Sequence, residues 1–457
     1  MTRKPPHIVI AGGGVAAIEA LAALRALAGP LPRITLLAPE AELTSRPASV
    51  AAPFGLGAPA PLPFDAIQRH AHFLQHRGTL AAVDVEAHEA TESGGEVLGY
   101  DKLLVAIGAR RRAWLPGATS FGGAADAAAV SRALDDSPRI AFVLPAASSW
   151  PLPVYELAIM AAADLRDRGV EPEITVVTPE AAPLWVFGGK ASAAMAELLA
   201  ARGIALRTSA RAVAVQPGRL ELEGADPVLA DRVIALPYLD GPAVRGLPQD
   251  AHGFVPVDGH GRVPDVADVF AAGDATTFPL KQGGLATQQA DAAAEMIAKE
   301  LGVAVRPAPF RPVIRGLLLT GGAPLYMRSA LSESGEVVEG AVRATRKPDS
   351  VVSQRALWWP PGKIAGRYLA PLLATARPPL LATSQLQDFT AGAVEDDRQD
   401  ARELALLLAD EDAVMGDYAQ ALHALDAAAA LSGGVLPAGW SAKRESWLAL
   451  SRPHATI

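Results

Sequence analysis

The sequence predicts an α/β protein built from several domains, and three observations carry that prediction. The chain has 457 residues, which is about three times the length of an ordinary domain. Half of the residues are apolar and 20% are charged, so there is ample apolar material for buried cores. Short apolar runs that end in glycine alternate with longer helical stretches, a pattern typical of parallel sheets covered by helices.

The first elements form a strand, a helix and a second strand. Residues 7–11 are a short apolar run, which fits a buried strand. Residues 15–28 have a helical pattern that Gly29 and Pro30 bring to an end. A second apolar run covers residues 34–38, so we expect a β-α-β unit at the start of the chain.

The turn inside this unit reads Gly-Gly-Gly-Val-Ala-Ala, a G-x-G-x-x-A variant of the dinucleotide-binding fingerprint. Gly12 permits the tight turn, Gly14 lets the backbone approach a pyrophosphate, and Ala16 and Ala17 keep the helix close to the strand. Glu40 follows the second strand and is our candidate for the ribose hydroxyls. An ordinary glycine-rich loop is the alternative, but strand, helix, second strand and acid together favour a nucleotide.

Two later strands also end in glycine, one at Ala106 and Gly108, the other at Gly273 and Asp274. With the first fingerprint, their order and spacing over residues 5–305 resemble flavoproteins of the pyridine nucleotide-disulfide oxidoreductase superfamily. The resemblance implies that the first segment binds the ADP part of FAD. It also implies that the strand ending at Gly108 closes the first half of the FAD domain and that Asp274 accepts hydrogen bonds from the ribityl chain.

The resemblance implies further flavin contacts. A glycine-led helix follows Asp274, and its positive N-terminus would face the flavin pyrimidine edge. We predict contacts from the amides of Leu285 and Ala286, with Lys281 as a second candidate. Arg46 and Pro47 resemble the loop that lies along the flavin in this group.

The middle of the chain, residues 116–240, departs from the family pattern. We expect an NAD(P)-type domain, yet no second glycine fingerprint follows its first strand. Pro145, Pro151 and Pro153 stand there instead, and proline has no amide to donate to a phosphate. This combination resembles the sulfide:quinone oxidoreductase-like branch and, more distantly, the type II NADH dehydrogenases. The chain has no cysteine, so it lacks the redox cysteines that sulfide chemistry needs in that branch.

These observations predict an FAD-dependent oxidoreductase that passes electrons through noncovalent FAD to a quinone or another small acceptor. NAD(P)H stays open as the donor, and catalytic residues stay unassigned. The alternative is a flavin-binding module with little turnover that senses redox state or binds a protein.

The last third of the chain contains a small α+β interface domain, residues 306–385, and a helical tail, residues 386–457. The tail has one tetratricopeptide-like hairpin, so a protein is a candidate partner for it. Trp358 and Trp359 lie beside Lys363 and Arg367, and they fit either contact with a membrane surface or packing at an interface. The FAD domain then comprises residues 1–115 and 241–305.

Composition narrows the partners and the location. The formal charge of −8 argues against nucleic acid. The N-terminus lacks a signal-peptide core, so we expect a cytoplasmic protein, with peripheral contact at the inner face of the membrane as the alternative. Homodimerisation stays open. Among His70, His72 and His76, positions 70 and 72 fall on different helical faces, and no carboxylate nearby completes a ligand set, so we expect no metal site.

Overall fold

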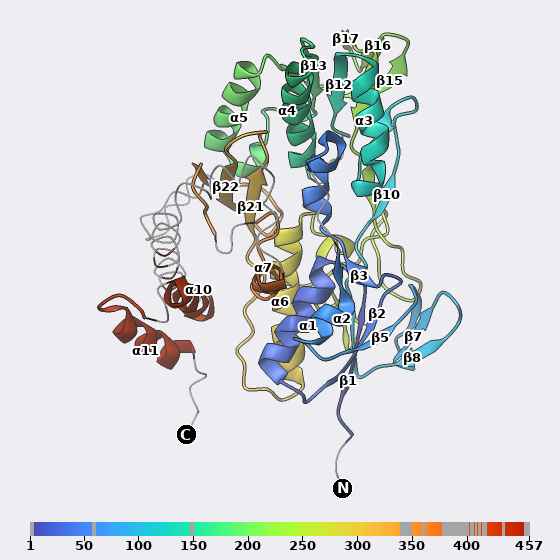
Figure 1. Ribbon diagram of the computed structural model, residues 1–457. Helices are drawn as coiled ribbons and strands as arrows, with labels where there is room; N and C mark the ends of the chain where they lie inside the picture. The colour runs from blue at the N-terminus through green and yellow to red at the C-terminus, as the bar shows by residue number, and fades with distance from the viewer. Residues whose placement is uncertain are drawn as a thin grey trace.

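The computed structural model describes residues 4–56, 61–146, 150–338, 350–358, 362–376, 418–431 and 435–451, together with 402, 406, 409 and 413. Two parallel five-stranded sheets organise the chain, one in each lobe of Figure 1. The chain leaves the first sheet after β9 (Lys102–Val105), builds the second, and returns with β20 (Val269–Ala271). The predicted α/β fold with two Rossmann-like domains is confirmed. The domain boundaries themselves stay predictions.

The first sheet has the order β20-β9-β1-β2-β5, and each neighbouring pair is parallel. Its central strand β1 is buried on both faces, as parallel strands covered by helices are. Helices α1 and α6 pack against each other beside this sheet (Figure 1). The bounds are β1 (His7–Ala11), β2 (Arg33–Leu37), β5 (Leu74–His76), α1 (Val15–Ala28), α2 (Phe64–Gln68) and α6 (Gly283–Glu300).

The second sheet has the order β11-β18-β12-β13-β14, again parallel throughout. Helix α4 begins at Leu152 and includes Pro153, because proline is tolerated in a first turn. The bounds are β11 (Thr119–Ser120), β12 (Arg139–Val143), β13 (Glu173–Val177), β14 (Ala205–Arg207), β18 (Arg232–Ala235), α3 (Ala127–Asp136), α4 (Leu152–Asp167) and α5 (Gly189–Ala201).

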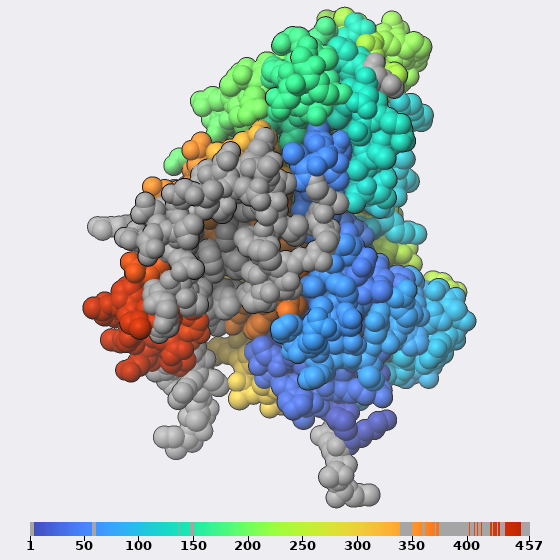
Figure 2. Space-filling view, viewed as in Figure 1, coloured from blue at the N-terminus to red at the C-terminus, as the bar shows by residue number. Residues whose placement is uncertain are grey.

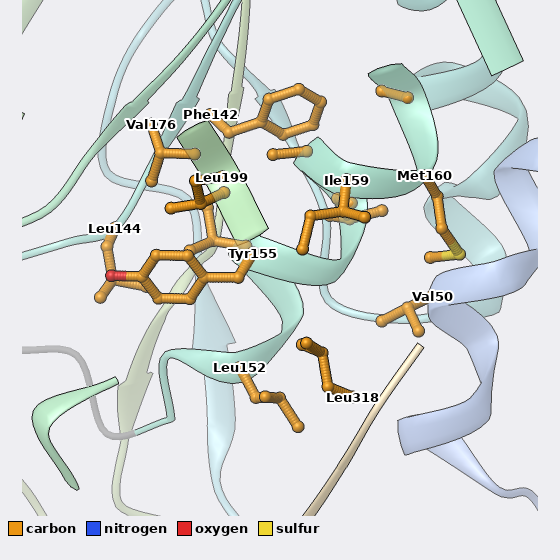
Figure 3. Close-up of a cluster of buried hydrophobic side chains, with 14 of the residues drawn as sticks. Val50, Phe142, Leu144, Leu152, Tyr155, Ile159, Met160, Val176, Leu199 and Leu318 are labelled. Atoms are coloured by element: carbon orange, nitrogen blue, oxygen red, sulfur yellow. The ribbon is translucent and has the colours of Figure 1, made fainter. Parts of the chain in front are cut away.

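The core of the second lobe includes side chains from outside residues 116–240. Figure 3 shows Val50 beside Met160 of α4 and Leu318 beside Leu152 of α4. Val50 belongs to η1 (Arg46–Phe54), the blue segment that lies against the green upper lobe in Figure 2. The two lobes therefore share a hydrophobic core, which holds them in one position relative to each other.

Shorter sheets complete the fold. The antiparallel pairs and ladders are β3 (Glu42–Leu43) with β4 (Leu62–Pro63), β6 (Leu80–Asp84) with β7 (Glu89–Glu92) and β8 (Val97–Gly99), β10 (Arg110–Arg112) with β19 (Tyr238–Asp240), and β15 (Ala212–Gln216) with β16 (Arg219–Leu222) and β17 (Ala225–Leu229).

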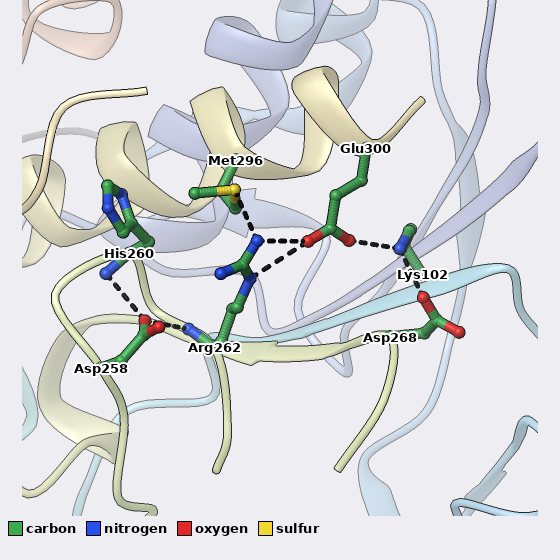
Figure 4. A network of polar contacts seen from close by, with 7 residues as sticks. All are labelled: Lys102, Asp258, His260, Arg262, Asp268, Met296 and Glu300. Carbon is green, nitrogen blue, oxygen red and sulfur yellow. Dashed lines mark hydrogen bonds and ion pairs between the residues drawn. The ribbon is translucent and has the colours of Figure 1, made fainter. Parts of the chain in front are cut away.

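An ion-pair network joins the two segments of the first domain (Figure 4). Lys102 of β9 contacts Asp268, just before β20, and Glu300 at the end of α6. Arg262 donates to Glu300 at 2.9 Å and reaches the Met296 sulfur at 3.0 Å. Because Lys102 is only 11% exposed, its pairs are screened less than surface pairs are.

The C-terminal part contains the antiparallel sheet β21 (Val313–Leu318), β22 (Leu325–Ala330) and β23 (Ser350–Ser353), followed by α7 (Leu369–Ala376). The Trp358 ring packs edge-on against Tyr326 at 5.2 Å and is 5% exposed, so this tryptophan fills an interior position. Trp359 lies outside the described residues.

The described part of the tail contains α10 (Tyr418–Leu431) and α11 (Trp440–Ser451), which pack on each other. Trp447 of α11 is buried with Leu425 of α10 in a small separate core. Among the described residues, no helix is long and apolar enough to span a bilayer.

Candidate functional site

One cavity of about 580 Å³ lies where the lobes meet, within the usual range for ligand sites. Its walls come from both segments of the first domain, from the middle domain and from the C-terminal sheet. Most of the site residues predicted from sequence line it: Gly12, Gly14, Ala16, Glu40, Arg46, Pro47, Ala106, Gly108, Asp274 and Ala286. Ala17, Gly273 and Leu285 stand behind the wall.

The glycine turn and the start of α1 form one end of the cavity. Gly12 has φ +119°, and a Cβ there would stand 2.2 Å from the Ala106 carbonyl oxygen, so only glycine fits. A Cβ at Gly14 would meet nothing within 4 Å, which leaves room for a ligand. No side chain caps α1 and no acid stands in its first turn, so its free amides are available to an anion.

Glu40 lies three residues after β2 and lines the same end of the cavity. Its backbone carbonyl accepts a hydrogen bond from Gln75 Nε2 at 3.0 Å. A Cβ on Gly13 would stand 3.0 Å from Glu40 Oε2, so the carboxylate lies against the glycine turn. Ala17 is fully buried behind this turn, as its packing role requires.

Asp274 enters the cavity from the short turn η4 (Gly273–Ala275). Gly273 has φ +75°, and a Cβ there would lie 3.0 Å from the Ala16 Cβ, so glycine brings η4 against α1. Gln289 of α6 accepts the Gly273 amide at 2.7 Å and holds the turn. Burial raises the pKa of Asp274, whereas Lys281 and Arg46 oppose that rise. Within the described residues, no hydrogen bond to the Asp274 carboxylate occurs, so its oxygens can accept from a ligand.

Lys281 lies in the same wall of the cavity, and backbone carbonyl groups bind its ammonium group. Its Nζ donates to the carbonyl oxygens of Thr276 and Phe278, the latter at 2.7 Å, and lies 3.9 Å from the Phe254 ring centre. Burial lowers the pKa of Lys281 to about 8, although Asp274 and Asp250 raise it. The carbonyl contacts fix its position beside Asp274.

The start of α6 differs from the sequence prediction. Gln282 is the N-cap, and its side-chain oxygen accepts the Leu285 amide at 2.8 Å. The Ala286 amide donates to the Gln282 carbonyl at 2.9 Å. Both predicted amides are therefore engaged within the helix, and Gln282 and Gly283 line the cavity together with Ala286. The Leu285 side chain packs into the core of the middle lobe.

Arg46 and Pro47 open η1, the segment that crosses from the first lobe to the second. Ser49 Oγ donates to the Arg46 carbonyl at 2.6 Å and tightens this first turn. Both residues line the cavity, so η1 brings a cation to the place where the lobes meet.

A buried ion pair closes the opposite end of the cavity. Glu156 of α4 pairs with Lys363, and the two side chains are 1% and 9% exposed. Glu156 Oε1 also accepts the Leu319 amide at 2.7 Å. Burial raises the pKa of Glu156 against the opposing effect of Lys363, and burial lowers the pKa of Lys363 against the effect of Glu156.

The sequence suggests Trp150, Tyr155 and Glu156 as the lining of a donor pocket, but it does not pair Glu156 with Lys363. Lys363 attracted attention only as a neighbour of the tryptophans, and no local pattern links it to a glutamate so far away along the chain. Trp150 lines the cavity, whereas Tyr155 is fully buried in the core. Among the described residues, no cluster of three potential metal ligands occurs.

Comparison with known families identifies the class. The model of the pyridine nucleotide-disulphide oxidoreductase family matches residues 6–296, well over half of the chain. The chain belongs to this family, as the sequence predicts. It is an FAD-dependent oxidoreductase, and NAD(P)H is the nucleotide substrate of its family.

Solved structures show the same fold at low sequence identity. The sulfide:quinone oxidoreductase of Aquifex aeolicus has a TM-score of 0.68 and 21% identity, covering 76% of this chain and 86% of that one. The ferredoxin reductase of the CYP199A2 system of Rhodopseudomonas palustris has a TM-score of 0.57 and 19% identity, covering 72% and 83%. The NAD-dependent persulfide reductase of A. fulgidus has a TM-score of 0.53 and 19% identity, covering 71% and 64%.

The residues around the cavity fit FAD. The uncapped start of α1 suits a pyrophosphate, and the carboxylates of Glu40 and Asp274 suit hydroxyl groups. Arg46 and Lys281 supply positive charge further along the cavity. This fit supports the predicted contacts with FAD.

Proposed function

We propose that this protein passes electrons through noncovalently bound FAD from a small donor, a dihydronicotinamide among the candidates, to a quinone-class acceptor. Residues 1–115 and 241–305 hold the cofactor in this proposal, and residues 116–240 and 306–385 shape the approach to it. Bound FAD supplies a carrier that takes two electrons from one partner and gives them to another.

The observation that carries the proposal is the ion pair at the cavity wall. Glu156 and Lys363 are almost fully buried, yet both line the cavity. Apolar side chains line the same cavity, with Trp150, Leu152 and Leu317 among them. A cavity with apolar walls and one proton-carrying pair suits a flat acceptor such as a quinone, which takes up two electrons and two protons.

The pair can act as an acid because burial favours the neutral form of both groups. Burial pushes the pKa of Glu156 up and the pKa of Lys363 down, so both groups move toward the physiological range. A proton held by Lys363 is then available to an acceptor oxygen at the wall. The Leu319 amide keeps Glu156 in place while that proton moves.

No thiol takes part in this route, because the chain has no cysteine. Lys281 and Arg46 act as fixed positive charges near Asp274 and favour an electron-rich ligand in the cavity. The chain's own contribution is therefore binding, orientation, charge and one proton source.

The test compares acceptors after anaerobic reduction of the purified flavoprotein with dithionite. We expect fast reoxidation by a water-soluble benzoquinone, and we expect Lys363→Met to slow it at least tenfold. Reoxidation by ferricyanide, which takes electrons without protons, provides the matched control and should change less than threefold. Equal slowing with both acceptors would refute the proton role, and no reoxidation by quinone would refute the acceptor class.

A second candidate is a flavin-binding module with little turnover. The prolines at the start of α4 favour it, because they weaken the usual site for a dinucleotide donor. A flavin band that only dithionite bleaches, in protein that no quinone reoxidises, would establish this alternative.

A further inference from the structure

A Pro-Glu pair follows the second strand of the β-α-β unit in each lobe. Ala38-Pro39-Glu40 follows β2, and Thr178-Pro179-Glu180 follows β13. Each glutamate is the third residue after the second strand of a β-α-β unit. In dinucleotide-binding units an acid near this point accepts hydrogen bonds from the adenosine ribose. Glu40 and Glu180 can therefore be compared directly.

The two glutamates have opposite surroundings. Glu40 is exposed and lines the cavity. Glu180 instead accepts hydrogen bonds from the Tyr155 hydroxyl at 2.5 Å and the Thr178 hydroxyl at 3.0 Å. The nearby backbone amides of Leu184 and Trp185 also lower its pKa. With both hydroxyl groups bound to it and this carboxylate turned into the protein, Glu180 has less to offer a ribose.

Tyr155 fixes this arrangement from α4. Its side chain is fully buried and fills the space between α4 and the end of β13 (Figure 3). The loop after Glu180 closes over the carboxylate, with Leu184 at φ +52°. Tyr155 and this loop therefore occupy the crevice where the adenosine would enter.

The phosphate side is also altered. In α1 the first-turn amides are free, whereas in α4 Pro151 is the N-cap and Pro153 stands in the first turn. The Val154 amide already donates to the Pro151 carbonyl at 3.1 Å. Within residues 150–154, the two prolines have no amide and Val154 is engaged, so only the Trp150 and Leu152 amides are left for a phosphate.

We propose that the middle domain does not recognise the ADP half of a nicotinamide dinucleotide. This inference rests on the proposed function for the reaction it concerns: the donor loses a hydride from C4 and becomes a pyridinium, and FAD takes both electrons. A dihydronicotinamide is then selected in the cavity by its ring end alone. The protein does not distinguish NADH, NADPH and a donor without ADP.

The first experiment measures binding rather than turnover. ADP-ribose is titrated into the FAD-loaded protein by calorimetry, with the FAD site filled so that it cannot compete. We expect no saturable heat up to about 1 mM, which corresponds to binding weaker than roughly 4 kcal/mol. A dissociation constant below about 100 µM would overturn the inference.

The second experiment measures anaerobic flavin reduction by NADH, NADPH and reduced nicotinamide mononucleotide. We expect second-order rate constants within about threefold of one another, without saturation. A NADH rate at least 100-fold above that of the mononucleotide would overturn the inference. If none of the three bleaches the flavin while dithionite does, the dihydronicotinamide part of the proposed function fails, and the ADP-ribose titration still decides the inference.

Matched variants separate the two glutamates. Glu180→Gln should lower the melting temperature and leave the NADH to NADPH rate ratio unchanged. Glu40→Gln should weaken FAD binding at least threefold, because the proposed flavin site uses this acid. If Glu180→Gln changed the ratio of the NADH and NADPH rate constants by more than threefold, Glu180 would contact the ribose, and the proposal would be wrong.

Discussion

Replacing Lys363 with methionine tests the buried pair most directly. The substitution keeps an unbranched side chain one atom shorter but leaves the Glu156 carboxylate, 1% exposed, without its cation. Removing one partner of a buried ion pair costs about 3–5 kcal/mol, because a buried charge is left uncompensated. We expect a loss of that size in the free energy of unfolding at pH 8.

The pH dependence of this loss follows from the carboxyl group. Burial already raises the pKa of Glu156, and Lys363 holds the rise back, so Lys363→Met raises this pKa further. A carboxyl with a raised folded-state pKa is neutral and costs little at low pH. The penalty grows as pH rises through that pKa. The variant should therefore approach wild-type stability at about pH 5 and fall away from it toward pH 8.

The measurement is urea unfolding followed by tryptophan fluorescence at a fixed excess of FAD, since bound ligand adds to stability. The double variant Glu156→Gln, Lys363→Met serves as the control. It removes both charges, and its amide oxygen can still accept the Leu319 amide, so we expect it within about 1 kcal/mol of wild type. Additive losses in the double variant, or a Lys363→Met loss independent of pH, would refute the reasoning.

Three further predictions concern the first lobe and the closed crevice. Gly12→Ala should reduce the flavin content of the purified protein at least tenfold, measured by absorbance, because the added Cβ would collide with the Ala106 carbonyl. Asp274→Ala should raise the FAD dissociation constant about 10- to 100-fold in a fluorescence titration, since hydrogen bonds to a charged group contribute about 1.5–3 kcal/mol; an unchanged constant would remove Asp274 from the site. Burial raises the pKa of Glu180 to about 7, so the wild type should lose up to about 3 kcal/mol of stability between pH 4.5 and 7. Glu180→Gln should lack that slope, and equal slopes in both proteins would contradict the assignment.

The sequence predicted the parts of the site that depend on local pattern. The glycine turn at Gly12, the acid at Glu40 and the strand end at Asp274 are each readable within a few residues. Each lies on the cavity because carboxyl ends of parallel strands meet at one edge of a sheet. The predicted amide of Leu285 is different, because the side chain of Gln282 competes for it as an N-cap. The only sequence feature that indicates this cap is Gln282, which stands directly before Gly283 and Gly284.

The ion pair between Glu156 and Lys363 could not be predicted from local sequence patterns. Glu156 and Lys363 are 207 residues apart, and their pairing depends on how the C-terminal sheet packs on α4. Periodicity and spacing describe one element at a time, so they do not show which charges two distant elements bring together. Such a pair becomes visible only when tertiary packing is known.

The two lobes show why the same local sequence does not guarantee the same ligand. A proline and a glutamate follow the second strand in each, and the β-α-β framework is complete in each. What differs is the neighbouring helix: α1 starts after glycine with small side chains, whereas α4 starts on proline and presents Tyr155. The small residues of α1 leave its first-turn amides free and leave space for a ligand. In the second lobe the Tyr155 hydroxyl donates a hydrogen bond to Glu180, and the carboxylate is held inside the protein. The first turn of the helix, more than the acid itself, therefore determines whether this fold accepts a dinucleotide.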